Sequence, residues 1–116
     1  MNSSAPLVAV VVLNFNGKKC LLSCLRSLAA LHYPHFFTVV VDNNSKDDSF
    51  SLAKESFPQH VFIKNTENKG FSGGMNVGMK AAFEAGAQWV WLFNNDATTD
   101  SSTLDVLIAT ATSHPQ

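Results

Sequence analysis

The chain has 116 residues, 46% of them hydrophobic, and a formal net charge of −1 at pH 7. This length suits one domain with its own core, and the near-neutral charge argues against nucleic-acid binding. No apolar stretch reaches the roughly 20 residues that a membrane-spanning helix needs. Residues 1–6 lack the basic start of a signal peptide, so we expect a disordered N-terminus over 1–6 and one domain over 7–116.

Four apolar runs predict four β-strands, at Val8–Leu13, Phe37–Val41, Val61–Ile63 and Trp89–Phe93. Continuous apolar runs of strand length are typical of strands buried on both faces of a parallel sheet, and we expect the last run to be the central strand. Each run stops at a cluster of polar residues. Parallel strands would bring these clusters to one edge of the sheet, which is where open α/β sheets bind ligands.

Helical spacing of apolar residues predicts a helix after each strand, over Lys18–Leu31, Ser45 to about Phe57, a Ser72 cap to Ala85, and Ser101–Thr112. The alternation of strands and helices favours right-handed βαβ units. The predicted fold class is therefore α/β, a Rossmann-like open and mostly parallel four-stranded sheet with flanking helices.

Two of these helices carry clear inner faces. The first should bury Leu21, Cys24, Leu25, Leu28 and Leu31, and the third should bury Met75, Met79, Ala82 and Phe83, with Gly86 as its stop. Cys20 and Cys24 alone are weak evidence for a metal site, so core packing of a cytosolic thiol is the better interpretation. The four histidines (His32, His35, His60 and His114) lack ligand spacing and are expected to be structural or on the surface.

Two carboxylates end predicted strands. Asp96 could hold a divalent cation that bridges phosphate oxygens and offsets the charge of a leaving diphosphate, or it could simply cap the next turn. Asp42 could accept hydrogen bonds from a nucleobase or a ribose hydroxyl, or it could form an Asx turn with the residues that follow. From position alone, both interpretations stay open for each residue.

The glycine-rich segment Gly70–Gly74 could present backbone amides to a phosphate or a sugar. It fits neither G-x-G-x-x-G nor the P-loop pattern, so spacing alone indicates a tight turn before a helix.

Phe15 could stack on a base or pack in the core. The amides of Asn16, Asn44, Asn68 and Asn76 could bond hydroxyls, although a single Asn is usually a cap or turn residue.

Taken in order, the four polar strand ends resemble the nucleotide-sugar-binding half of family-2 glycosyltransferases, which are inverting enzymes with a GT-A-type fold. The matching segments are Val11–Gly17, Val40–Ser45, Asn68–Asn76 and Leu92–Asp96. The G-F-S-G-G-x-N form with an N-x-D strand end looks most like rhamnosyltransferase-type members. That resemblance implies dTDP-rhamnose as the donor, or otherwise a UDP-sugar.

The resemblance also implies roles for single residues. Leu13 to Phe15 would line the base pocket, Asp42 would bond the base, and Asp96 would bind Mg²⁺ or Mn²⁺ in a D-x-D-type element. Asn94 stands where many members carry the first aspartate, which lowers the expected metal affinity. The predicted nucleotide-sugar-binding residues are Leu13, Asn14, Phe15, Asn16, Asp42, Asn44, Gly70, Gly73, Gly74, Asn76, Asn94, Asn95 and Asp96.

In the family, a later half supplies the acceptor site and the catalytic base. Asp100 and Asp105 are too close to the D-x-D-type element for that role, so the catalytic residue stays unknown.

We expect the chain to be a fragment or a reduced donor-binding module. We expect it in the cytoplasm, with attachment to the inner membrane face as an alternative location. It would be inactive alone, and its uncovered apolar surface would drive self-association or pairing with the missing half.

Two other functions remain as alternatives. The first is a non-catalytic nucleotide-binding or assembly module that uses the same pocket. The second, less favoured, is a NAD-linked or receiver-like domain. The first strand is not followed by G-x-G-x-x-G, and Asn14 and Asn16 stand where a receiver would need acids.

Overall fold

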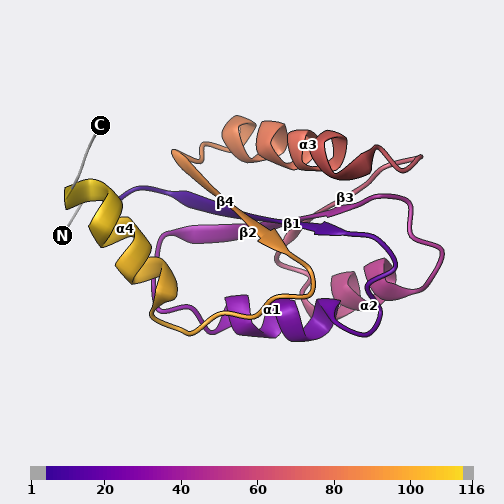
Figure 1. Ribbon diagram of the computed structural model, residues 1–116, viewed down its shortest axis with the longest axis horizontal. Helices are drawn as coiled ribbons and strands as arrows, with labels where there is room; N and C mark the ends of the chain where they lie inside the picture. Colours follow the sequence, from indigo (N-terminus) through magenta and orange to yellow (C-terminus); the bar gives the residue numbers. More distant parts are fainter. Residues whose placement is uncertain (1–4, 114–116) are drawn as a thin grey trace.

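The computed structural model describes residues 5–113, and it contains one four-stranded parallel sheet with helices on both faces (Figure 1). This confirms the predicted fold class. The elements in chain order are β1 (Val8–Asn14), α1 (Leu21–Ala29), β2 (Phe36–Asp42), α2 (Ser49–Ser56), β3 (Val61–Lys64), α3 (Gly70–Glu84), β4 (Trp89–Asn94) and α4 (Thr103–Ser113).

The strand order is β3-β2-β1-β4, so β1 and β2 are the inner strands. The prediction that Trp89–Phe93 is central and buried on both faces is wrong. In β4 the side chains of Trp89 and Leu92 are 39% and 42% exposed, and Phe93 is buried. The chain adds β2 and β3 on one side of β1 and then returns to place β4 on the other side, which leaves β4 a single neighbour.

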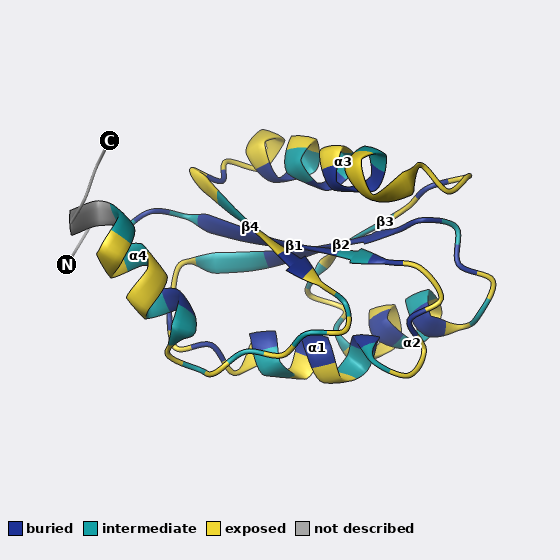
Figure 2. Cartoon of the chain, in the orientation of Figure 1, coloured by how far each residue is buried: buried dark blue, intermediate teal, exposed yellow. Residues whose placement is uncertain are grey.

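Each face of the sheet has its own core. Figure 1 shows α3 over one face, with α1 and α2 over the other. Successive side chains of a strand point to opposite faces, so Val10 and Val12 of β1 pack with α1, whereas Ala9 and Val11 pack with α3. Figure 2 shows the inner strands as mostly buried, with an intermediate stretch at the start of β2, and the outer surfaces of the helices as exposed. The apolar runs of β1 and β2 are therefore explained by burial on two faces.

Helix α1 begins later than expected and ends at Ala29, and it buries the predicted residues Leu21, Cys24, Leu25 and Leu28. Leu31 follows the helix and is also buried. Both cysteines are free thiols. Cys24 is buried, and burial raises the pKa of its thiol to about 12, so it behaves as a small apolar core residue. This confirms the core-packing interpretation of Cys24.

Helix α3 begins at Gly70, so the predicted glycine loop is wrong, as is the predicted Ser72 cap. A Cβ on Gly74 would lie 2.5 Å from Leu13 Cδ1, and one on Gly78 would lie 2.4 Å from Val11 Cγ1. Because these two glycines have no side chain, the helix can lie close to the sheet. This close packing offsets the low helix propensity of glycine, which is about 1 kcal/mol per residue less favourable than that of alanine.

The inner face of α3 differs from the prediction at one end. Met75 and Ala82 are buried as expected, Met79 is half-buried, and Phe83 is 54% exposed. Each residue turns the helix by about 100°, which carries Phe83 away from the sheet that Ala82 contacts. Gly86, with a φ of 100°, follows the last turn and ends the helix as predicted.

Helix α2 begins at Ser49 and its N-cap residue is Asp48, so the predicted start at Ser45 is wrong. Helix α4 begins at Thr103, two residues later than expected, and lies at one end of the molecule (Figure 1). None of the helices among residues 5–113 is long and apolar enough to cross a membrane.

The predicted disorder of residues 1–4 and the surface position of His114 lie outside the described residues. Within the described part, Pro6 is buried and its carbonyl accepts a hydrogen bond from the Tyr33 hydroxyl.

Candidate functional site

A cleft of about 300 Å³ lies at the carboxyl ends of β1 and β4. The chain leaves β1 toward β2 on one side and places β4 on the other, so this is the topological switch point where open α/β sheets bind ligands. The volume is at the lower end of the range for small-molecule sites. The residues that line the cleft are Leu13, Phe15, Phe71, Asn94, Asn95 and Asp96.

A buried network of polar side chains lies behind the cleft, centred on Asn14, which has no exposed surface. Its Nδ2 donates to Asp42 Oδ1 and to Ser49 Oγ, each at 2.9 Å. Its Oδ1 accepts a hydrogen bond of 2.9 Å from Asn95 Nδ2. Asn14 therefore ties the end of β1 to the ends of β2 and β4, and it was predicted only as a binding residue.

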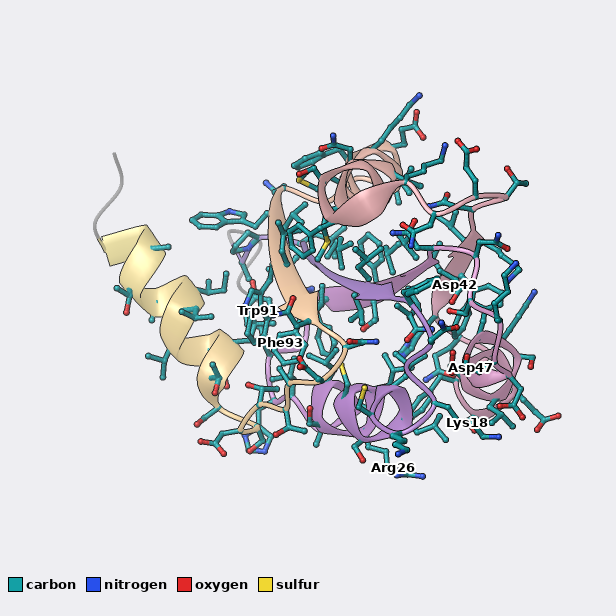
Figure 3. All side chains as sticks on the ribbon, turned by 45° about the vertical axis from the view of Figure 1, so that its right-hand side comes forward. Lys18, Arg26, Asp42, Asp47, Trp91 and Phe93 are labelled. Carbon is teal, nitrogen blue, oxygen red and sulfur yellow. The ribbon has the colours of Figure 1, made fainter. Side chains whose placement is uncertain are left out.

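Asp42 is also fully buried, and four donor groups surround its carboxylate. The Ser45 N–H (2.8 Å) and hydroxyl (2.7 Å), the Asn14 amide, and Lys64 Nζ (3.2 Å) all donate to it. Burial alone would raise the pKa of Asp42, but these hydrogen bonds outweigh burial and lower the pKa below its usual value. Figure 3 shows Asp42 on the side of the molecule that carries β3 and α2.

The hydrogen bonds between Ser45 and Asp42 form the Asx-type turn that was one interpretation of this segment. The predicted contact of Asp42 with a nucleobase stays a prediction. Because the carboxylate is enclosed, such a contact would require one of its present hydrogen bonds to open.

Asn43 has a structural role that the sequence analysis missed. Its Nδ2 donates to the Gly70 carbonyl at 3.0 Å, and its Oδ1 accepts from Asn65 Nδ2 at 2.9 Å and from the Lys69 N–H at 3.2 Å. These bonds join the end of β2 to the start of α3. The only sequence signal for this role was its place beside Asp42 in a run that also fits an ordinary turn.

The loop after β1 depends on Gly17. A Cβ there would lie 2.2 Å from Asn14 Oδ1 and 2.4 Å from Asn95 Nδ2, so any larger residue would break into the network. Asn16 has a φ of 52° in the left-handed region, and its Oδ1 accepts from the Lys46 N–H at 2.7 Å. Asn16 therefore holds the loop against the β2–α2 connection and does not line the cleft.

The structure brings some of the predicted site residues to the cleft and places the others elsewhere. Leu13, Phe15 and Asn94–Asp96 line the cleft, whereas Asn14 and Asp42 lie behind it. Gly70, Gly73 and Gly74 form the first turns of α3, and Asn44, with a φ of 66°, shapes the turn after β2. Asn76 is exposed on α3 and is absent from the cleft lining. Phe71 lines the cleft. It lies in the segment Gly70–Asn76, which the family resemblance implied as a wall of the site, but it was not among the single residues predicted to bind the ligand.

The side chains of the cleft could supply oxygen ligands to a hard cation. Asp96 is exposed there and adjoins the amides of Asn94 and Asn95. Among the described residues, no group of three or more His, Cys, Asp or Glu side chains could hold a metal ion. One carboxylate beside two amides could supply part of the oxygen coordination of a hard cation such as Mg²⁺ or Mn²⁺.

The model of the family described as glycosyl transferase family 2 matches residues 9–116. The chain belongs to this family. The family-2 chain is 26% identical to a galactofuranosyltransferase of Mycolicibacterium smegmatis, over 93% of this chain and 36% of that protein. It is 25% identical to the UDP-N-acetylglucosamine–dolichyl-phosphate N-acetylglucosaminyltransferase of Methanococcus voltae, over 78% of this chain and 41% of that protein.

Solved structures of similar fold agree with this assignment. The S. aureus protein TarS in complex with UDP-GlcNAc has a TM-score of 0.81 and 26% identity, over 93% of this chain and 32% of that one. A mannosyltransferase of Pyrobaculum calidifontis in complex with GDP-Man and Mn²⁺ has a TM-score of 0.76 and 25% identity, over 88% and 31%. The family-2 chain thus has the predicted GT-A-type architecture and spans less than half the length of these relatives.

Proposed function

We propose that this family-2 chain is the donor-binding portion of a glycosyltransferase, with a nucleoside diphosphate sugar bound in the cleft between the ends of β1 and β4. The observation that carries the proposal is that one cleft at the switch point holds both an exposed aromatic ring, Phe15, and an exposed carboxylate, Asp96. The ring suits a nucleobase, and the carboxylate suits the cation of a diphosphate.

Asp96 is the residue proposed to hold Mg²⁺ or Mn²⁺, with Asn94 and Asn95 as neighbouring amides. When bound, the cation would supply positive charge that offsets the negative charge of the leaving diphosphate. The Mn²⁺ in the similar mannosyltransferase supports this choice of cofactor. The enclosed residues Asn14 and Asp42 would keep the strand ends in place around the ligand.

The identity of the donor is part of the proposal. The relatives bind UDP-GlcNAc and GDP-Man, which shows that one fold accommodates different bases and sugars. The rhamnosyltransferase-like motif supports dTDP-rhamnose as the first donor to test and UDP-sugars as the second.

We propose a hydroxyl group of a glycan as the acceptor of the whole protein. We also propose a cytoplasmic location, which the free thiols Cys20 and Cys24 favour.

Thermal stability with and without nucleotide sugars tests this proposal. We expect one of the UDP-, dTDP- or GDP-sugars to raise the Tm in the presence of Mn²⁺. Asp96→Ala should remove the Mn²⁺-dependent part of the shift, whereas Asp100→Ala, which changes another exposed carboxylate of the same loop, should keep it. A folded sample whose Tm responds to none of these ligands would overturn the proposal.

A second function, a non-catalytic nucleotide-binding or assembly module, is favoured by one observation. The described residues that line the cleft combine aromatic rings, two amides and the carboxylate of Asp96, a set that can hold a nucleotide without performing transfer. This hypothesis predicts that the chain binds the nucleotide sugar but transfers no sugar when acceptor glycans are supplied. Sugar transfer by the purified 116-residue chain would exclude it.

A further inference from the structure

Phe71 is the most exposed aromatic side chain of the cleft. It lies in the first turn of α3 and is 60% exposed, and Phe15 on the loop after β1 is 46% exposed. Full burial of a Phe side chain is worth about 1.5–3 kcal/mol, so two rings that are each about half exposed in one cleft give up part of that stabilisation. Large apolar side chains that gather at a concave site mark a binding surface.

The backbone that carries Phe71 is firmly held. Gly70, with a φ of 73°, turns the chain into α3, and its N–H donates to Asn68 Oδ1 at 2.8 Å. The Gly70 carbonyl accepts from Asn43 Nδ2 at 3.0 Å, and Asn43 is itself buried at the end of β2. The start of α3 is therefore anchored to the sheet, and Phe71 is presented to the cleft by a fixed turn.

Phe15 reaches the same cleft from a different element. Its neighbour Asn14 is buried in the polar network, and the backbone N–H of Asn16 donates to Ser45 Oγ at 2.8 Å. Two aromatic rings are thus held by separate anchors, one on the β1 loop and one on α3, and both line the same cleft together with Leu13. This arrangement suits a flat ligand that offers two faces.

We propose that Phe71 is a second base-contacting residue, and that Phe15 and Phe71 bind the two faces of the nucleobase of the donor. This inference rests on the proposed function, since it requires that the cleft takes a nucleoside diphosphate. Every base has two π-faces, so stacking contributes affinity without choosing among bases. Discrimination between uracil, thymine and guanine must then come from groups that meet the edge of the base.

The test compares two phenylalanines of the same helix. Phe71→Ala should raise the Kd of UDP, dTDP and GDP, measured by calorimetry with Mn²⁺, by about tenfold or more for each nucleotide. Phe83→Ala is the matched control, because Phe83 is 54% exposed on α3 and lies outside the cleft lining. It should change each Kd less than about twofold, since surface substitutions away from a site have small effects.

Two further measurements separate stacking from a general effect on the site. Phe71→Tyr, which keeps an aromatic face, should bind nucleotides as the unchanged chain does. Inorganic pyrophosphate with Mn²⁺ should bind equally well to the unchanged chain and to Phe71→Ala, because it has no base. A Phe71→Ala loss that is equally large for pyrophosphate would overturn the inference.

The possible failures are distinguishable. If the unchanged chain binds no nucleotide, the proposed function fails and this inference fails with it. If the unchanged chain binds nucleotides and Phe71→Ala binds them as tightly as Phe83→Ala does, the inference about Phe71 is overturned and the proposed function stands. Circular dichroism of both variants checks that each is folded.

Discussion

Asn14 and Asp42 are joined by a buried hydrogen bond of 2.9 Å across the adjacent ends of β1 and β2. Each residue also binds a further strand, because Asn95 of the β4 end donates to Asn14 and Lys64 of β3 donates to Asp42. The carboxyl ends of all four strands therefore meet at this pair. The cleft that we propose as the donor site lies directly in front of it.

Replacing Asn14 by leucine should destabilise the protein by about 2–4 kcal/mol. The change leaves the Asn95 amide without its acceptor and removes a donor from the buried Asp42 carboxylate, and such unpaired groups are costly. Urea unfolding monitored by circular dichroism would measure the loss. Asn76→Leu, at an exposed position on α3, should stay within about 0.5 kcal/mol of the unchanged chain. Equal losses in the two variants would contradict this role of Asn14.

Acid should destabilise the protein partly through Asp42. Its pKa is lower in the folded state than in the unfolded chain, so its contribution is complete above the unfolded pKa and is lost as the pH falls through the folded pKa. The free energy of unfolding should therefore fall below about pH 4. In Asp42→Asn the decrease between pH 7 and pH 3 should be smaller, although this variant is less stable at pH 7.

The pKa of Asp47 is also lowered, mainly by hydrogen bonds from Ser49, so the Asp42 variant should retain part of the acid effect. Asp47→Asn is the natural comparison for the unfolding experiment, since Asp47 has more contact with solvent than Asp42. An Asp42→Asn curve that falls with acid as steeply as that of the unchanged chain would show that Asp42 does not carry this dependence.

Gly78→Ala should lower stability by about 1–3 kcal/mol, even though alanine favours a helix more than glycine does. The new Cβ would lie 2.4 Å from Val11 Cγ1 and 3.0 Å from Val41 Cγ2, which forces α3 away from the sheet. Ser72→Ala, at an exposed position in the same helix, should be neutral or slightly stabilising. Thermal unfolding of the two variants gives the comparison, and a Gly78→Ala protein more stable than the original would refute the close packing.

Mn²⁺ should bind to this chain only together with a nucleoside diphosphate. One exposed carboxylate, Asp96, leaves most coordination positions to phosphate oxygens and water. The electron paramagnetic resonance signal of free Mn²⁺ should be nearly unchanged by the protein alone and should decrease when both UDP and protein are present. UDP without protein is the control for direct chelation. Tight binding of Mn²⁺ by the protein alone would contradict the proposed ligand set.

The exposed apolar side chains of β4 and α4 should drive self-association. Trp89 and Leu92 of the edge strand are 39% and 42% exposed, and Val106 and Leu107 of α4 are 60% and 44% exposed. Burial of such surface between copies is favourable. Sedimentation velocity should show a mass that rises with protein concentration, and Leu107→Lys should reduce that rise. A strictly monomeric species at high concentration would argue against this surface as an interface.

The elements of the fold could be predicted because their signals are local. Apolar runs located the strands, and the spacing of Leu21, Leu25 and Leu28 located α1, since the periodicity of a helix or strand depends only on neighbouring residues. The same runs gave the polar clusters at the strand ends. Parallel pairing brings these clusters to one edge whatever the order of the strands, so a cleft at that edge, which we propose as the donor site, could be expected from the sequence as well.

The tertiary structure alone decided three features, because each depends on contacts between residues distant in the sequence. The strand order made β4 an edge strand, although its apolar run resembles those of β1 and β2. Helix α3 begins at Gly70, within the predicted glycine loop, and Gly74 of this segment packs closely against Leu13 of β1. The enclosure of Asn14 and Asp42 made them structural partners behind the cleft, while Phe71 reached its lining from α3. Residue type and local period carry no information about such distances, which arise only when the strands pair and the helices pack on the sheet.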